Sequence, residues 1–169
     1  LAVCVMASPG FAAPLDPSFP APVVMTAAQD APLGSYALPL GPFRDGEIAA
    51  QATVGPMRQQ AWQVQSDSVT TVALMQGLRA QVEAAGYQVL FECETQACGG
   101  FDFRFGIEVM AEPAMHIDLG DFRYLAASRD GAAGKEYLSL LVSRSPLFGY
   151  VQMTQVGGAL PATVLTAST

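Results

Sequence analysis

Between Asp67 and Gly86, small and apolar residues recur at the spacing of an α-helix. They fall on one stripe of a helical projection: Thr71, Leu74, Met75, Leu78, Val82 and Ala85. Asp67 or Ser68 can cap the start of such a helix, and Gly86 stands where a C′ glycine commonly ends one. The pattern therefore predicts one amphipathic helix over about residues 69–85.

Elsewhere, apolar and polar positions alternate with the two-residue period of half-buried strands. The predicted strands are 35–40, 58–65, 87–91, 121–128, 135–143 and 148–156. The first is expected at a sheet edge, because Pro39 cannot donate a hydrogen bond to a neighbouring strand. The third is apolar on both faces near its end and is expected to be central in the sheet. Turns at Asp130-Gly131 and Ser145-Pro146 separate the last three strands.

Residues 101–109 alternate most strictly, with Phe101, Phe103, Phe105, Ile107 and Val109 on one side. This period predicts a further strand. A helix that begins just after Gly100 stays an alternative, because a turn imposed by nearby cysteines would not be visible in the pattern. The sequence thus predicts an α+β fold, with one main helix packed on a mainly antiparallel sheet of five to seven strands and a local disulfide. The helix is expected to cover the sheet face that carries Leu138, Leu140 and Val142.

Residues 1–12 are uncharged and mostly apolar, and they are too few to span a bilayer. Small residues stand three before, and immediately before, a cut after Ala12, which is typical of signal-peptide cleavage. We interpret this segment as a partial signal peptide, so that Cys4 is removed with it. Lipid modification of Cys4 is the alternative, since Leu1-Ala2-Val3 precedes it.

Three segments are expected after the signal peptide. Residues 13–34 are rich in Pro and Ala and predict an extended leader rather than packed structure. Residues 35–156 form the predicted folded domain. Residues 157–169 begin with two glycines and continue with small residues and Thr, which predicts a linker to a further domain that this sequence does not include.

The chain carries 15 acidic and 8 basic side chains, for a formal charge of −7, and Lys135 is its only lysine. Because the positive charges are few and scattered, the composition argues against nucleic-acid binding and against anionic lipid surfaces. No segment of the mature chain is long and apolar enough to predict a transmembrane helix.

Cys93 and Cys98 are the chemically most informative residues, since they follow a predicted export signal. In an exported domain, two such cysteines predict a disulfide that closes a short surface loop. A metal site that recruits His116 and Asp118 is an alternative, as is a redox pair, although thioredoxin-like cysteines are separated by two residues rather than four.

A catalytic alternative uses Cys98 as nucleophile and His116 as base, with the backbone of Gly99 and Gly100 as an oxyanion hole. It requires an unpaired Cys98, and no third residue is evident to orient His116, the only histidine. A partly buried structural imidazole is the simpler interpretation. Asp118 and Asp121 flank a Leu-Gly turn, where Asp commonly bonds its own backbone, although they could also form an acid/base pair. No cofactor is expected.

Arg104 and Arg123 each stand between aromatic residues. A guanidinium there can stack on a ring and pair with Asp102, Asp118 or Asp121. Both arginines are interpreted first as anchors of the fold. With His116 and Asp118, they are also the candidate binding face for a partner that carries carboxylates.

Three stretches around these residues resemble one family of envelope proteins: 86–93, 98–105 and 113–125. They are similar to the N-terminal periplasmic domain of certain OmpA-family proteins of α-proteobacteria. The resemblance implies a periplasmic or outer-membrane-associated protein in which an OmpA-like domain beyond residue 169 binds peptidoglycan. For the present chain it implies a non-enzymatic positioning or partner-binding role among cell-envelope proteins. The alternative is a small secreted hydrolase or metal-dependent enzyme that uses Cys98, His116 and Asp118.

Overall fold

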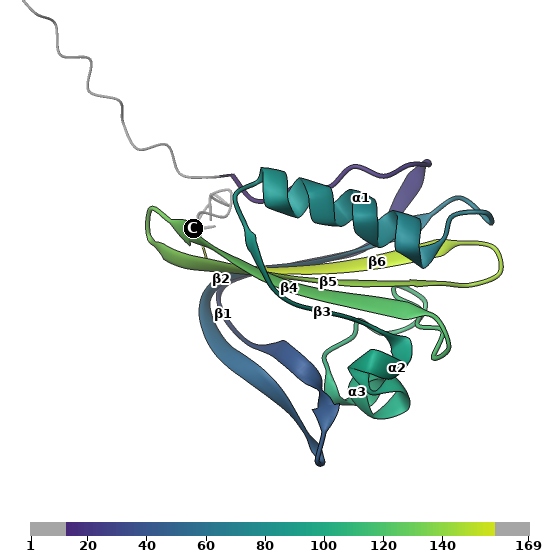
Figure 1. Ribbon diagram of the computed structural model, residues 1–169. Helices are drawn as coiled ribbons and strands as arrows, with labels where there is room; N and C mark the ends of the chain where they lie inside the picture. The colour runs from purple at the N-terminus through teal and green to yellow at the C-terminus, as the bar shows by residue number, and fades with distance from the viewer. Residues whose placement is uncertain (1–12, 158–169) are drawn as a thin grey trace, which may run out of the picture.

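The computed structural model of the protein describes residues 13–157, and a single six-stranded sheet dominates them (Figure 1). Its strands are β1 (Val23–Arg44), β2 (Glu47–Val64), β3 (Gln88–Glu94), β4 (Phe122–Gly131), β5 (Gly134–Arg144) and β6 (Gly149–Val156). They lie in the order β1-β2-β6-β5-β4-β3, and all neighbours are antiparallel. The helices are α1 (Thr71–Ala84), α2 (Thr95–Cys98) and α3 (Gly100–Gly106).

The predicted α+β class, with one main helix, is therefore wrong. The described chain is mostly sheet and has three helices, of 14, four and seven residues. The reason lies in β1 and β2, which are 22 and 18 residues long although the pattern predicted six and eight. Three register shifts interrupt their pairing, and each one breaks the alternation by which a strand is recognised in a sequence. The antiparallel pairing, the six strands and the local disulfide do agree with the prediction.

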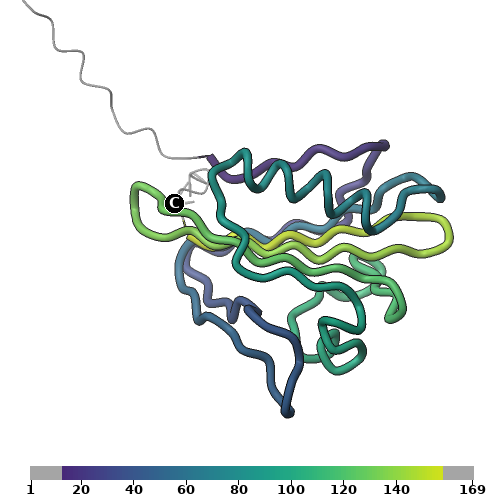
Figure 2. Tube along the Cα trace, in the orientation of Figure 1, coloured from purple at the N-terminus to yellow at the C-terminus, as the bar shows by residue number. Residues whose placement is uncertain are grey.

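Helix α1 covers one side of the sheet, here called the α1 face (Figures 1 and 2). Its buried stripe, which includes Leu74, Leu78 and Val82, shares one core with Leu138 and Leu140 of β5, as predicted. The cap is Thr70 rather than Asp67 or Ser68, because the Thr70 hydroxyl accepts a hydrogen bond from the Ala73 N–H, at 3.1 Å. Gly86 does follow the helix in a left-handed conformation, with φ +87°.

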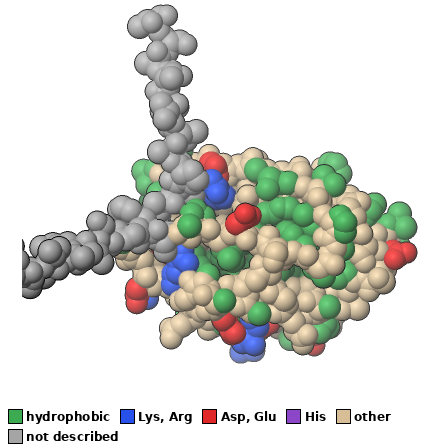
Figure 3. Space-filling model, turned by 90° about the horizontal axis from the view of Figure 1, so that it is seen from above, with side chains coloured by type: hydrophobic (Ala, Val, Ile, Leu, Met, Phe, Trp, Pro, Cys, Tyr) green, Lys and Arg blue, Asp and Glu red, His purple; other side chains and the backbone are tan. Residues whose placement is uncertain are grey.

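The segment before β1 also packs on the α1 face, contrary to the predicted unpacked leader. Leu15 and Phe19 join the core there, and the Phe19 ring lies 5.4 Å from the Trp62 ring. β1 then begins at Val23, so the fold starts well before residue 35. The backbone of this proline-rich segment bonds to side-chain amides instead of to a neighbouring strand. Gln155, for example, accepts from the Leu15 N–H and donates to the Leu15 carbonyl. Charged side chains are sparse on this face (Figure 3).

In the region of the cysteines, the structure contradicts one prediction and resolves one alternative that the pattern left open. β3 lies at an edge of the sheet rather than in its centre, and its alternate residues are exposed. Residues 100–106 form helix α3, the alternative to a strand. Gly99 and Gly100 turn the chain there with φ +117° and +57°, conformations that favour glycine. Residues 35–40 do lie in an edge strand, β1.

The opposite side of the sheet, here called the α3 face, carries α2, α3 and the segment 107–121 (Figure 1). Its core contains Phe103, Phe122 and Tyr124, together with Leu38 from the outer half of the β1–β2 hairpin, which bends beneath the sheet (Figures 1 and 2). The last three strands are joined by short turns. The first turn lies between the paired residues Gly131 and Gly134, slightly later than predicted.

The second turn lies at the predicted Ser145-Pro146 position. The Ser145 N–H donates to the Phe148 carbonyl at 2.8 Å, and the Phe148 N–H donates to the Ser145 hydroxyl at 3.1 Å. Within residues 13–157, none of the helices has the length and apolar character that crossing a membrane requires. The predicted signal peptide, residues 1–12, lies outside the described residues, as does the predicted linker, residues 157–169, apart from Gly157.

Candidate binding site

Cys93 and Cys98 are bonded to each other, which confirms the predicted disulfide. Their Cα atoms are 5.1 Å apart, and the bridge joins the end of β3 to the end of α2. Cys98 is fully buried. A nucleophilic or metal-ligating cysteine must be a thiolate, which neither sulfur is in this state. The catalytic and metal alternatives both need a free thiolate, and neither Cys93 nor Cys98 supplies one while they are bonded.

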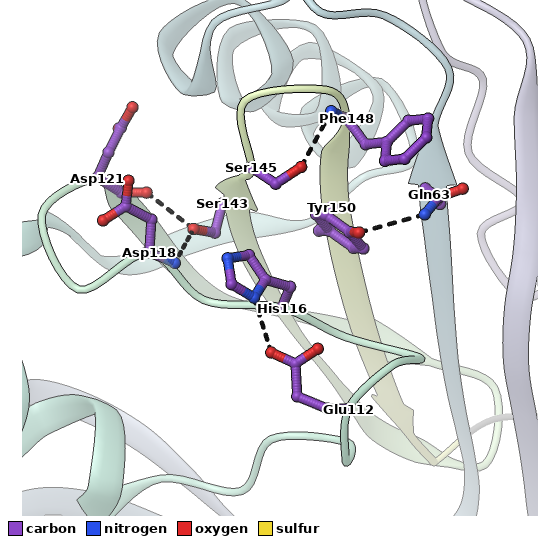
Figure 4. Close-up of polar contacts among 9 residues, drawn as sticks. All are labelled: Gln63, Glu112, His116, Asp118, Asp121, Ser143, Ser145, Phe148 and Tyr150. Atoms are coloured by element: carbon purple, nitrogen blue, oxygen red, sulfur yellow. Dashed lines mark hydrogen bonds and ion pairs between the residues drawn. The ribbon is translucent and has the colours of Figure 1, made fainter.

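His116 is held by two neighbours on the α3 face (Figure 4). Its Nδ1 atom is hydrogen-bonded to Glu112 Oε1, at 2.7 Å, and its ring lies 5.5 Å from that of Tyr150. Tyr150 in turn accepts a hydrogen bond from the Gln63 amide, at 3.2 Å. The His116 side chain is 35% exposed, so the interpretation as a partly buried imidazole agrees with its position.

Asp118 and Asp121 form a local turn around Ser143 (Figure 4). Asp118 Oδ1 accepts from the Gly120 N–H at 2.8 Å, as expected for an Asp that bonds its own loop. Ser143 accepts from the Asp118 N–H and donates to the Asp121 carbonyl, both at 2.8 Å. Asp121 Oδ1 accepts from the Thr71 hydroxyl at 2.6 Å. Ser143 is buried, and its hydroxyl donates its proton to the Asp121 carbonyl. Ser143 therefore stabilises this turn and is not placed to act as a nucleophile.

Arg123 joins three elements of the fold. Its Nη2 atom is 2.8 Å from Glu94 Oε2 at the end of β3, and its Nε donates to the Thr71 hydroxyl at the start of α1. Because Arg123 itself belongs to β4, its side chain connects β3, β4 and the start of α1. The geometry supports its interpretation as an anchor.

Arg104 is engaged differently. Its guanidinium carbon lies 4.6 Å from the centre of the Phe105 ring, and no carboxylate of the described chain is within ion-pair distance of it. The neighbouring rings of Phe101 and Phe105 pack on each other at 4.6 Å, and both remain about 60% exposed. The candidate binding residues are Arg104, His116, Asp118 and Arg123. Arg104 is the one among them whose polar group has no partner within the described chain.

Arg104 also lines a groove of about 570 Å³ on the α3 face. One wall consists of Ala27 and Gln29 of β1 and Gln59 of β2, and the other of residues 104, 107–111 and 114. The second wall is tied to the sheet. Gln152 accepts from the Met110 N–H at 2.7 Å and donates to the Glu108 carbonyl at 3.1 Å, while the Thr26 hydroxyl donates to the Ala114 carbonyl at 2.6 Å.

Buried tyrosine hydroxyls lie beneath the α3 face. Burial raises the pKa of Tyr36 to about 12, and the negative charge of Glu108 contributes in the same direction. Burial likewise raises the pKa of Tyr124 well above its usual value, and its hydroxyl donates to the Pro39 carbonyl at 2.9 Å. Both phenols are therefore neutral at physiological pH. Across residues 13–157, no three His, Cys, Asp or Glu side chains gather in a way that could hold a metal ion.

Sequence reasoning singled out Arg104 but not the rest of the groove. Gln29 and Gln59 are separated by 30 positions along the chain and face each other only through the pairing of β1 with β2. Residues 107–109 of the second wall were expected to end the strand 101–109, whereas the structure has no strand there. No model of a known protein family matches the sequence, and no curated protein is significantly similar to it.

Proposed function

We propose that this chain is a non-enzymatic, partner-binding domain of an exported cell-envelope protein of the OmpA family. The observation that carries the proposal is the disulfide between the ends of β3 and α2, next to the short helix α3 on which Phe101 and Phe105 are exposed. In this proposal, the protein is periplasmic or associated with the outer membrane. Binding to peptidoglycan belongs, in this proposal, to an OmpA-like domain outside the sequence.

Export is supported by the chemistry of the cysteines. Disulfides form and persist in oxidising compartments such as the bacterial periplasm, and they are rare in the cytosol. The apolar start of the chain and the resemblance around Cys93 and Cys98 point to the same compartment.

Partner binding is supported by the two exposed phenylalanines. Phe101 is 61% exposed and Phe105 is 60% exposed. They lie on the seven-residue helix α3, and Phe103, between them in the sequence, is fully buried. Adjacent exposed aromatic rings on a well-anchored element are typical of protein-binding surfaces, where aromatic and arginine side chains contribute most of the binding energy.

Photo-crosslinking in the producing cell tests the proposal. A photoreactive amino acid at position 105 of the full chain should give a discrete adduct with another envelope component. The same residue at position 147 is the control, because Leu147 is 63% exposed but lies on the loop between β5 and β6. Equal adducts at both positions, or none at position 105, would contradict a binding role for this surface.

Alkylation of intact cells tests the compartment in the same strain. A membrane-impermeant maleimide should label Cys93 and Cys98 only after reduction. Labelling without a reductant would show that the thiols are free and would return the enzymatic alternative to consideration.

A further inference from the structure

The groove on the α3 face contains an arginine whose charge the fold leaves unneutralised. Within the part of the chain that the structure describes, no carboxylate pairs with Arg104. Four other arginines each pair with one: Arg58, Arg79, Arg123 and Arg129. The Arg104 guanidinium stacks on the Phe105 ring, and Arg104 is one of the residues that line the groove. A planar guanidinium is the side chain best suited to bind a carboxylate through two parallel hydrogen bonds.

The opposite wall presents two side-chain amides. Gln29 and Gln59 face each other across the β1–β2 pairing and therefore lie on the same side of the sheet. Neither amide makes a hydrogen bond to any residue between 13 and 157. An amide both donates and accepts, so it can satisfy the N–H and C=O groups of a peptide backbone.

Three other glutamines of this protein already bind backbone in that way. Gln155 holds both backbone groups of Leu15, at 2.8 and 3.0 Å, and Gln81 holds both backbone groups of Ser18, at 2.7 and 2.9 Å. Gln152 holds the Met110 N–H and the Glu108 carbonyl. Glutamine amides thus bind irregular chain segments repeatedly in this fold, and those of Gln29 and Gln59 are free to do the same.

We propose that the groove binds an extended peptide segment that carries a carboxylate. The carboxylate pairs with Arg104, and Gln29 and Gln59 hold the peptide backbone. A volume of about 570 Å³ suits a segment of a few residues, within the range of small-ligand sites. The inference rests on the proposed partner-binding function and specifies the chemistry of the partner.

Glu108 also lines the groove and opposes a bound carboxylate. It forms no ion pair with Arg104, so it does not neutralise the guanidinium. The Glu108→Gln variant should therefore bind an acidic peptide more tightly than the wild-type protein does.

The test is an NMR titration of the isotope-labelled chain with three pentapeptides. The first has a central glutamate and blocked ends, the second has glutamine instead, and the third has neutral side chains and a free C-terminal carboxylate. The glutamate peptide should shift the side-chain amides of Gln29 and Gln59 and the Nε–H of Arg104. The blocked glutamine peptide should shift the two amides only at about tenfold higher concentration, and the Arg104 Nε–H little. Comparison of the first and third peptides shows whether an internal or a terminal carboxylate is preferred.

Variants give the matched control. Arg104→Gln should weaken the better acidic peptide about tenfold, as expected from the loss of a charged hydrogen bond. Arg44→Gln should leave binding unchanged, because Arg44 also lacks a carboxylate partner among residues 13–157 but lies near the tip of the β1–β2 hairpin, outside the groove.

Equal binding of the glutamate and glutamine peptides, or equal losses in the two arginine variants, would overturn the proposed carboxylate site. A crosslinked partner at position 105 would still stand in that case, so the two proposals can fail separately. Tighter binding by Arg104→Gln would likewise overturn the inference.

Discussion

At the scale of single residues, the Arg129 guanidinium contacts three separate parts of the described chain. Its Nε pairs with Glu136, its Nη1 donates to the Ala85 carbonyl at 2.8 Å, and its Nη2 donates to the Ala13 carbonyl at 3.1 Å. Its guanidinium also lies 4.3 Å from the centre of the Tyr87 ring. One side chain therefore connects two strands, the C-terminal end of α1 and the N-terminal segment.

Arg129→Ala should lower the free energy of unfolding by about 3–5 kcal/mol, because it leaves the Glu136 charge buried without a partner. The side chains of Arg129 and Glu136 are only 9% and 5% exposed. Urea denaturation measures the loss. The matched control is Lys135→Ala, which removes the exposed pair with Asp130 and should cost less than about 1 kcal/mol. Similar losses in the two variants would show that burial does not distinguish these pairs.

At the scale of elements, the α2–α3 turn depends on a covalent bond rather than on helix propensity. Helices of four and seven residues are too short to be stable alone, since helix nucleation is costly. The disulfide, the buried Phe103 ring and the two left-handed glycines hold them instead. The proposed binding surface on α3 is therefore expected to lose order when the disulfide is reduced.

Replacing both Cys93 and Cys98 with Ser should destabilise the protein by about 2 kcal/mol, the chain-entropy value for such a short loop. Amide hydrogen exchange should accelerate in residues 95–106, while β4, β5 and β6 stay protected. Acceleration across the whole sheet would instead show that the disulfide stabilises the global fold. Titration of the wild-type protein with a reductant provides a second measurement.

The packing of α1 leads to a separate prediction. Leu78 is 1% exposed in the core of the α1 face, so Leu78→Ala should cost about 2–5 kcal/mol in urea denaturation. Val72 lies on the same helix but is 42% exposed, and Val72→Ala should change stability by less than about 0.5 kcal/mol. A loss below that value for Leu78→Ala would contradict the observed packing.

At the scale of the whole molecule, the sheet requires the segment that composition marks as a leader. Residues 23–31 of β1 pair with residues 57–64 of β2, and Leu15 and Phe19 cover the core next to Trp62. A chain that starts at residue 35 would lose both and expose β2 as a new edge.

A chain of residues 35–157 should therefore unfold at a much lower urea concentration than one of residues 13–157, or fail to fold. Trp62 is the only tryptophan and is 3% exposed, so its fluorescence reports this directly. Equal midpoints for the two chains would mean that residues 13–34 contribute no stability.

Several features followed from local pattern, because their physical causes are local. Helix α1 has an uninterrupted stripe at positions 71, 74, 75, 78 and 82, and Gly86 ends it. The last strands alternate regularly, and the face of β5 that meets α1 was evident from Leu138, Leu140 and Val142. The disulfide followed from the cysteine spacing and the expected compartment. The sequence by itself thus determined α1, its partner face and the bridge.

Only the tertiary structure decided the rest. The alternation of Phe101, Phe103 and Phe105 favours a strand, yet the glycine turn after the disulfide makes these residues helical and buries Phe103 alone. Pro and Ala composition indicates an unpacked leader, yet glutamine amides distant in sequence bind its backbone. The groove joins residues about 75 positions apart, from Gln29 to Arg104. Such contacts depend on which strands pair and where their register shifts, which no periodicity within one segment can encode.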